Sequence, residues 1–288
     1  MSKTILVTGA STGFGRETAK TLLQAGHDVF ASMRDPQGKN QEHADALRAL
    51  GAEVVELDVT NTESVEQAVA AVVAKTGRID VLINNAGVAS AGVSEAFTAE
   101  QATTLFDVNV VGLHRVTRAV LPTFRSQQDG LIINIGSILG RVTFPFFGFY
   151  GASKFAVEAL TDSYRYELSQ LGVDVALVQP SAYPTQMYAS AGQPEDTARV
   201  VEYGAVGKIP GAMFEQFSSM LTGADAPNPQ DIASAIATLI ETPKGQRAAR
   251  TVVGAPYGSD SLNEATEPVQ AHVVDALGLG HLASVKTA

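Results

Sequence analysis

The chain has 288 residues, of which 45% are hydrophobic and 17% charged, so it can bury a large apolar core and shows no compositional sign of disorder. A formal net charge of −10 and a pI near 5.0, without any cluster of Lys and Arg, oppose binding to nucleic acid. The absence of Cys excludes disulfides and thiolate chemistry, and the five His show no close metal-ligand spacing, so we expect no metal site.

The N-terminus enters an apolar, strand-like segment at residues 4–8, which leaves no room for a signal peptide before it. No run of apolar residues is long enough to span a bilayer. We therefore expect a soluble, cytoplasmic protein.

Apolar runs alternate with helical patterns along the chain, which is typical of βα units wound into a parallel sheet. The predicted strands are residues 4–8, 28–33, 54–57, 81–84, 131–135, 173–178 and 251–253. The predicted helices are residues 13–25, 41–50, 63–76, 99–124 (with Pro122 near its end), 150–171 and 232–240. Right-handed crossovers then give a doubly wound α/β sheet in the order 3-2-1-4-5-6-7, a three-layer αβα Rossmann fold that forms one domain over residues 1–288.

The stretch from about residue 183 to 229 breaks this rhythm, because it is rich in Pro, Gly, Met, Phe and Tyr. Long irregular insertions in compact domains often serve as lids or binding loops. We interpret this stretch as a substrate lid after the sixth strand.

A glycine-rich turn, TGASTGFG at residues 8–15, lies between the first predicted strand and the first predicted helix. Glycine lets the backbone approach a pyrophosphate closely, and the free N–H groups at a helix start attract its charge. Turns also need glycine for purely steric reasons. Here the strand–turn–helix context favours phosphate binding.

Tyr150 and Lys154 stand four residues apart, on one face of a helix if that helix begins by Tyr150. A phenol has a reference pKa of about 10, so a nearby cation helps it to pass protons at neutral pH. Ser137, at the end of the fifth predicted strand, could stabilise negative charge on a carbonyl oxygen. Taken singly, each residue has an ordinary structural explanation: Tyr150 as a half-buried helix residue, Lys154 as a solvated charge and Ser137 as a turn residue.

Together these motifs resemble the classical short-chain dehydrogenases/reductases, and in narrower outline their hydroxysteroid/retinol dehydrogenase-like branch. The turn at residues 8–15 follows the family's TGxxxGxG spacing, and residues 84–87 match its NNAG segment. Residues 180–185 match its PGxxxT segment, with Ser181 in place of the usual Gly. The family's catalytic tetrad falls on Ser137, Tyr150, Lys154 and Asn109.

The resemblance implies an NAD(P)(H)-dependent oxidoreductase, a carbonyl reductase or alcohol dehydrogenase acting on CH–OH groups. A hydride would pass between the nicotinamide C4 and a substrate carbonyl, and Tyr150 would transfer the proton. Asn109 would distort its helix and organise a water near Lys154, which would also hold the nicotinamide ribose. The implied cofactor contacts are Gly9, Ser11, Thr12, Gly13, Phe14, Gly15, Arg34, Asp58, Val59, Asn85, Ala86, Gly87, Tyr150, Lys154, Pro180, Tyr183 and Thr185.

The choice of cofactor depends on the end of the second strand. Arg34 stands where NADP-preferring members carry a cation for the 2′-phosphate, to which Ser11 could add a hydrogen bond, while Met33 replaces the Asp of NAD-preferring relatives. The alternative is a solvated Arg34 with Asp35 selecting NAD. We favour NADP(H), with NAD(H) possible.

Aromatic and Met residues gather around the proposed chemistry and predict an apolar pocket for a hydrophobic ketone, aldehyde or alcohol. The candidate substrate-binding residues are Phe144, Phe147, Phe149, Met187 and Tyr188, with Met213, Phe214, Phe217, Met220 and Leu221 in the lid. Several of these side chains could equally be core or subunit contacts.

Two other functions remain open: a redox sensor that binds NAD(P) without turnover, and a nucleotide-sugar epimerase or dehydratase. The complete tetrad opposes the first, and the glycine spacing opposes the second. The resemblance also implies a homodimer or homotetramer joined through the long helices around Asn109 and Lys154, although a monomer is compatible with this branch.

Overall fold

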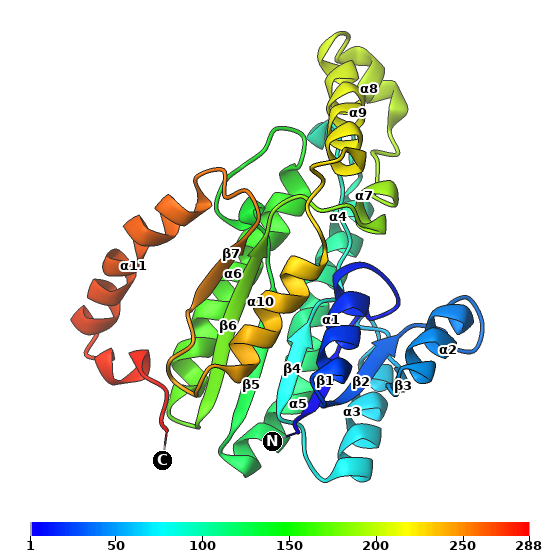
Figure 1. Cartoon of the computed structure of the whole chain (residues 1–288). Coiled ribbons are helices and arrows are strands. Elements are labelled where there is room, and N and C mark those ends of the chain that lie inside the picture. Colours follow the sequence, from blue (N-terminus) through cyan, green and yellow to red (C-terminus); the bar gives the residue numbers. More distant parts are fainter. Residues whose placement is uncertain (1, 288) are drawn as a thin grey trace.

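The computed structural model describes residues 2–287, and its centre is a seven-stranded parallel sheet. The strand order is β3-β2-β1-β4-β5-β6-β7, which confirms the predicted fold class (Figure 1). The strands are β1 Thr4–Val7, β2 Asp28–Met33, β3 Glu53–Glu56, β4 Val81–Asn84, β5 Gly130–Ile135, β6 Val173–Pro180 and β7 Arg250–Val253. The winding direction reverses between β1 and β4, so loops diverge at the carboxyl ends of these strands and leave a crevice there.

Helices cover both faces of the sheet, which explains why its central strands are apolar throughout rather than alternating. Along β1, Ile5 and Val7 face one helical layer and Leu6 faces the other. The first layer contains α1 Gly13–Gln24, α2 Gln41–Ala49 and α10 Gln230–Glu241. The second contains α3 Thr62–Thr76, α5 Leu113–Gln127 and α6 Gly148–Ser169.

The helix predicted over residues 99–124 consists of three pieces and runs beyond Pro122. These are α4 Ala99–Phe106, the π-helical turn η2 Asp107–Gly112, and α5, which continues to Gln127. A Cβ on Gly112 would lie 2.9 Å from Val59, so the wide turn packs closely against the chain after β3. Such π turns are frequent at functional sites.

The stretch from residue 183 to 229 is mostly helical, so its interpretation as an irregular insertion was wrong in that respect. It contains α7 Gln186–Ala189, α8 Thr197–Glu202, η4 Val206–Lys208 and α9 Ile209–Thr222. Along α9, Met213, Phe217 and Leu221 recur every four residues and form one apolar face, which accounts for the helix. Figure 1 shows α8 and α9 standing beyond the carboxyl end of the sheet.

A long helix follows β7 that the sequence analysis did not identify, α11 Ser259–Ala276, and a short turn, η5 Gly280–Ala283, comes after it. It lies beyond the β7 edge of the sheet (Figure 1) and is exposed along most of its length. Two short turns complete the framework near the crevice, η1 Ser94–Ala96 and η3 Ile138–Gly140. Within residues 2–287, no helix combines the length and apolar character needed to cross a membrane.

Candidate active site

The structure brings the hydroxyl of Ser137, the phenol of Tyr150 and the ammonium of Lys154 together at the carboxyl end of β5. Ser137 follows β5 and caps η3, where its Oγ accepts a hydrogen bond from the Leu139 N–H at 3.1 Å. Tyr150 lies in the first turn of α6 and is hydrogen-bonded to Ser137. Lys154 follows one turn later, with its Nζ 5.7 Å from the centre of the Tyr150 ring.

Burial governs the protonation of this group. Burial raises the pKa of Tyr150 to about 12, while the hydrogen bond with Ser137 acts in the opposite direction. Lys154 is only 5% exposed, and burial lowers the pKa of its ammonium to about 8. Its Nζ donates to the Ile135 carbonyl at 2.9 Å, which holds the side chain against the end of β5. At neutral pH the site therefore contains a neutral phenol beside a mostly protonated amine.

Asn109 connects three segments of the site from within the π turn. Its side chain accepts from the Val88 N–H at 2.8 Å and donates to the Val88 carbonyl at 2.9 Å, which fixes the loop after β4. It also donates to Ser153, whose hydroxyl donates to the Tyr150 carbonyl at 2.7 Å. A Cβ on Gly87 would lie 3.3 Å from Asn109 Oδ1 and 4.0 Å from Lys154 Nζ. Asn109 thus positions the start of α6 against the loop after β4.

The glycine-rich turn has the geometry that a dinucleotide needs. Gly9 and Gly13 adopt φ of +66° and +54°, which side chains disfavour. A Cβ on Gly15 would lie 2.5 Å from Asn85 Nδ2, which itself donates to the Thr8 and Gly9 carbonyls. Thr12 caps α1 without a side-chain hydrogen bond, so the first N–H groups of the helix are available to a pyrophosphate.

A family model described as short chain dehydrogenase matches residues 3–196. The chain belongs to this family.

Curated relatives of this short-chain dehydrogenase include two with named substrates. The chain is 42% identical to a 3-ketodihydrosphingosine reductase of Bacteroides thetaiotaomicron over 181 residues, 63% of this chain and 64% of that protein. It is 31% identical to human retinol dehydrogenase 8 over 258 residues, 83% of this chain and 78% of that protein. The chain thus spans just under two thirds of the length of the first relative.

Solved structures agree with the fold over almost the whole chain. A short-chain dehydrogenase from Streptomyces avermitilis is 31% identical, with a TM-score of 0.77 and 98% of both chains covered. A short-chain dehydrogenase/reductase from Burkholderia phymatum, solved in complex with NAD, is 27% identical, with a TM-score of 0.75 and coverage of 93% of this chain and 95% of that one. The chain is accordingly similar, over nearly its whole length, to a member of the family that was solved with a nicotinamide cofactor.

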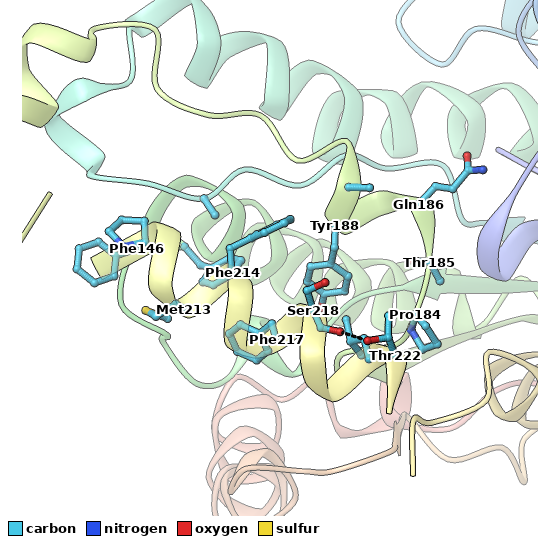
Figure 2. A pocket seen from close by; sticks show the side chains of 15 residues that line it. Phe146, Pro184, Thr185, Gln186, Tyr188, Met213, Phe214, Phe217, Ser218 and Thr222 are labelled. Atoms are coloured by element: carbon cyan, nitrogen blue, oxygen red, sulfur yellow. Dashed lines mark hydrogen bonds between the residues drawn. The ribbon is translucent and has the colours of Figure 1, made fainter. Parts of the chain in front are cut away.

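Two adjoining cavities open beside Tyr150. The larger has a volume of about 410 Å³ and lies between α7, α9 and the loop before α6 (Figure 2). The smaller contains Tyr150, and the two cavities share Phe147, Tyr188 and Phe217 as walls. Both are lined mainly by apolar side chains, so they suit a hydrophobic ligand.

Four of the five residues predicted to bind substrate line a cavity. Phe144 and Met187 line the smaller one, and Phe147 and Tyr188 line both. The fifth, Phe149, lines neither cavity and packs edge-on against Phe97 with ring centres 5.7 Å apart. Consecutive helical residues point about 100° apart, so Phe149 turns away from the cavity that Tyr150 faces.

The lid residues divide in the same way. Met213, Phe214, Phe217 and Leu221 line the larger cavity, whereas Met220 is 49% exposed and does not. Tyr257, after β7, lines the smaller cavity and packs edge-on against Phe144, with ring centres 5.4 Å apart. Sequence reasoning missed Tyr257. Its position directly after the last strand, where ligands of such sheets bind, was the available signal.

The ends of β2 and β3 form the outer part of the proposed cofactor site. Arg34 is exposed, while Asp35 turns back to accept a hydrogen bond from the Lys39 N–H at 2.8 Å. Asp58 accepts from the N–H and the hydroxyl of Thr60. The Val59 carbonyl accepts from Arg115 at 2.6 Å. Ser11 is partly exposed in the glycine turn.

The segment after β6 lies on the other side of that turn. Pro180 ends β6, and the Thr185 side chain would lie 3.6 Å from a Cβ on Gly13. The Tyr183 side chain is fully buried, packs edge-on against Phe14 with ring centres 5.5 Å apart, and reaches Asp231. Tyr183 can therefore meet a cofactor only through its backbone.

Proposed function

We propose that this short-chain dehydrogenase interconverts a hydrophobic ketone or aldehyde and the corresponding alcohol, with NADP(H) as the preferred cofactor and Tyr150 as the acid/base. The observation that supports this most directly is the convergence of Ser137, Tyr150 and Lys154 beside an apolar cavity. The glycine turn packs against the loop after β4, and the same loop reaches Lys154 at Gly87.

In the proposed reduction, the glycine turn and Lys154 would hold the nicotinamide cofactor, which would supply the hydride for the carbonyl carbon. Ser137 donates a hydrogen bond to the carbonyl oxygen and so stabilises the charge that develops there. Tyr150 gives its phenolic proton to the same oxygen, and the Lys154 ammonium stabilises the phenolate that remains. Oxidation of an alcohol reverses these steps. The neutral phenol and protonated amine expected at neutral pH are the forms that reduction requires.

The test is Tyr150→Phe, which removes the transferable proton and keeps the ring. We expect turnover to fall by about 1000-fold, with cofactor affinity nearly unchanged. Turnover is followed at the nicotinamide absorbance with a panel of carbonyl compounds and alcohols, and cofactor affinity by fluorescence titration. Retained turnover would exclude Tyr150 as the acid. A wild-type chain that binds cofactor but converts nothing would favour the sensor.

The preference for NADP(H) is proposed because Arg34 is exposed at the end of β2, while the neighbouring Asp35 carboxylate is engaged with the Lys39 N–H. Arg34→Ala should raise the KM for NADP(H) about tenfold or more and leave the KM for NAD(H) nearly unchanged, because only NADP(H) carries the 2′-phosphate. Arg48→Ala, which changes an exposed Arg on α2, is the matched control. Equal effects of Arg34→Ala on both cofactors would contradict the assignment.

A hydrophobic substrate is proposed from the apolar lining and the volume of the larger cavity. The names of the ketodihydrosphingosine reductase and retinol dehydrogenase relatives favour the same class. The segment from residue 183 to 229 would cover this substrate, since α7 and α9 supply much of the lining.

We also propose one domain, a cytoplasmic location and a homo-oligomer joined through η2 and α6, where Val111 and Phe155 are exposed.

A further inference from the structure

Tyr188 stands where the two cavities meet. It lines the larger cavity with Phe147 and Phe217, and the same three side chains line the smaller cavity that contains Tyr150. Tyr188 lies in α7, three residues after Thr185, and in Figure 2 its side chain points from α7 toward the face of α9 that carries Phe217 and Ser218. A molecule held at Tyr150 and extending into the larger cavity must therefore pass Tyr188.

The hydroxyl of Tyr188 differs from those of the other tyrosines with shifted pKa values outside the catalytic group. Tyr164 is bonded to His114, Tyr183 to Asp231 and Tyr203 to Glu95. Among residues 2–287, the Tyr188 hydroxyl has no hydrogen-bond partner, although most of the side chain is withdrawn from solvent. The hydroxyl itself is not fully buried, so solvent can reach it. A substrate that fills the cavity displaces this solvent, and the hydroxyl then costs free energy unless the substrate bonds to it.

Two further groups narrow the possible role of this hydroxyl. Burial, and then the proximity of Tyr150, raise the pKa of Tyr188 above its usual range, so the phenol stays neutral and can only form hydrogen bonds. Thr222, the nearby hydroxyl on α9, already donates to the Ser218 carbonyl at 2.9 Å. Thr185, Gln186 and Ser218 also line the larger cavity, but of its polar side chains Tyr188 is the one that also lines the smaller cavity with Tyr150.

We infer that Tyr188 is a specificity-determining residue whose hydroxyl donates a hydrogen bond to a second oxygen of the substrate. That oxygen lies on the apolar arm that runs from the reacting carbon past Phe147 and Phe217 into the larger cavity. The inference rests on the proposed function and names its substrate class: hydrophobic ketones that carry a hydroxyl or oxo group on their larger substituent, and the matching alcohols.

The Tyr188 hydroxyl would discriminate between substrates in two ways: it favours a substrate that accepts its hydrogen bond, and it disfavours one that leaves it without a partner. A plain ketone leaves the buried phenol without a partner, whereas an oxygenated ketone satisfies it and loses little of its own apolar contact. Replacing the phenol by phenylalanine removes the penalty and the attraction together. Tyr188→Phe should therefore abolish the discrimination between the two kinds of ketone.

The experiment compares a plain long-chain methyl ketone with counterparts that carry a hydroxyl or oxo group on the first, second or third carbon of the long chain. We expect the wild-type enzyme to favour the best counterpart by about tenfold or more in kcat/KM. In Tyr188→Phe this ratio should fall to about one. Tyr166→Phe, which removes a phenol hydroxyl from α6 outside both cavities, should preserve the wild-type ratio.

Two outcomes overturn the inference alone: the wild type favours no counterpart, or Tyr188→Phe keeps the wild-type ratio, including the case in which it lowers kcat/KM for both kinds of ketone by the same factor. The KM for the cofactor and the urea midpoint of unfolding check that Tyr188→Phe is otherwise intact, and both should match the wild type. A wild-type enzyme that reduces no ketone with either cofactor would overturn the proposed function, and the inference with it.

Discussion

At the scale of single residues, the position of Lys154 that suits the proposed reaction is unfavourable for its charged form. The proposed reaction uses a cation close to the Tyr150 ring, yet the same packing that places Lys154 there leaves its side chain only 5% exposed. A buried ammonium costs more than a buried neutral amine, which is why the pKa of Lys154 falls to about 8 from a model-compound value of 10.5. The folded state therefore binds this proton less tightly than the unfolded chain does.

This difference gives stability a definite pH dependence. Between pH 8 and 10.5 the unfolded chain keeps the Lys154 proton that the folded protein has released, so the free energy of unfolding rises with pH across this window. Lys154→Met removes the group. Between pH 7 and 9.5 we expect the cofactor-free wild type to gain about 2 kcal/mol relative to this variant.

Urea unfolding of both proteins at the two pH values measures the gain. The upper limit of pH 9.5 keeps tyrosines out of the comparison, because burial raises the pKa of Tyr150 and Tyr164 to about 12 and their unfolded forms ionise near pH 10. A wild type and variant whose difference in unfolding free energy is constant with pH would show that Lys154 is not buried as a cation.

At the scale of secondary-structure elements, the π turn η2 is the least regular part of the site. Its geometry turns Asn109 inward, where it pairs with both backbone groups of Val88 and with Ser153. Because Ser153 in turn bonds the Tyr150 carbonyl, the turn connects α6 to the loop after β4. The irregular helix is therefore part of what positions Tyr150.

Asn109→Leu keeps the approximate volume of the side chain but leaves the partly buried N–H and carbonyl of Val88 without their partner. A fully buried unsatisfied group costs about 1–3 kcal/mol, and Val88 retains solvent contact, so we expect the free energy of unfolding to fall by about 2 kcal/mol. Chemical denaturation measures this loss, and turnover should fall as Tyr150 loses its support. An Asn109→Leu protein as stable as the wild type would mean that the π turn persists without these hydrogen bonds.

The elements that the sequence predicted well are those whose apolar pattern is local. Strand Asp28–Met33 and strand Val81–Asn84 were predicted with the observed limits, because buried parallel strands are short apolar runs between turn residues. The π turn was not predicted, since it depends on contacts of Asn109 with Val88 and Ser153 that are distant in sequence. Helix α11 was missed because it is exposed on almost every side and contains Pro268, so no apolar stripe marks it.

The same distinction applies to the candidate site. Ser137, Tyr150 and Lys154 could be proposed from spacing, because they follow a strand or share one helix face. Spacing does not predict whether an aromatic side chain points into the cavity or away from it. Phe147 and Phe149 are two positions apart, and only Phe147 reaches a cavity. Direction at a helix start depends on where the helix begins, and α6 begins at Gly148 rather than at Tyr150.

At the scale of the whole molecule, the lid is joined to the body through a few polar contacts far from the sheet. Glu95, in η1, accepts hydrogen bonds from the Tyr203 hydroxyl at 2.7 Å and from Arg199 at 3.1 Å. Gln101 donates to the Gln193 carbonyl at 2.8 Å. Backbone hydrogen bonds of Gly192 with Ala89 and Ala91, and of Asp196 with Ala96, add to them. Apart from Leu221, α9 has no buried side chain, so polar contacts carry much of the attachment of this proposed lid. Segments held in this way open without global unfolding.

Glu95→Ala should therefore loosen the lid and leave the body unchanged. Arg199 and Lys208 are the two trypsin sites between residues 181 and 243, and both lie in the lid, so cleavage there reports its opening. Because exposed ion pairs are individually weak, we expect a modest increase in the cleavage rate, about fivefold, with no change in Tm. Glu215→Ala, which removes a carboxylate from the exposed side of α9, should be cleaved at the wild-type rate. The Phe217 ring of α9 also packs against Phe147, with ring centres 6.3 Å apart. Equal cleavage rates for Glu95→Ala and the wild type would mean that such apolar contacts, and not Glu95, hold the lid in place.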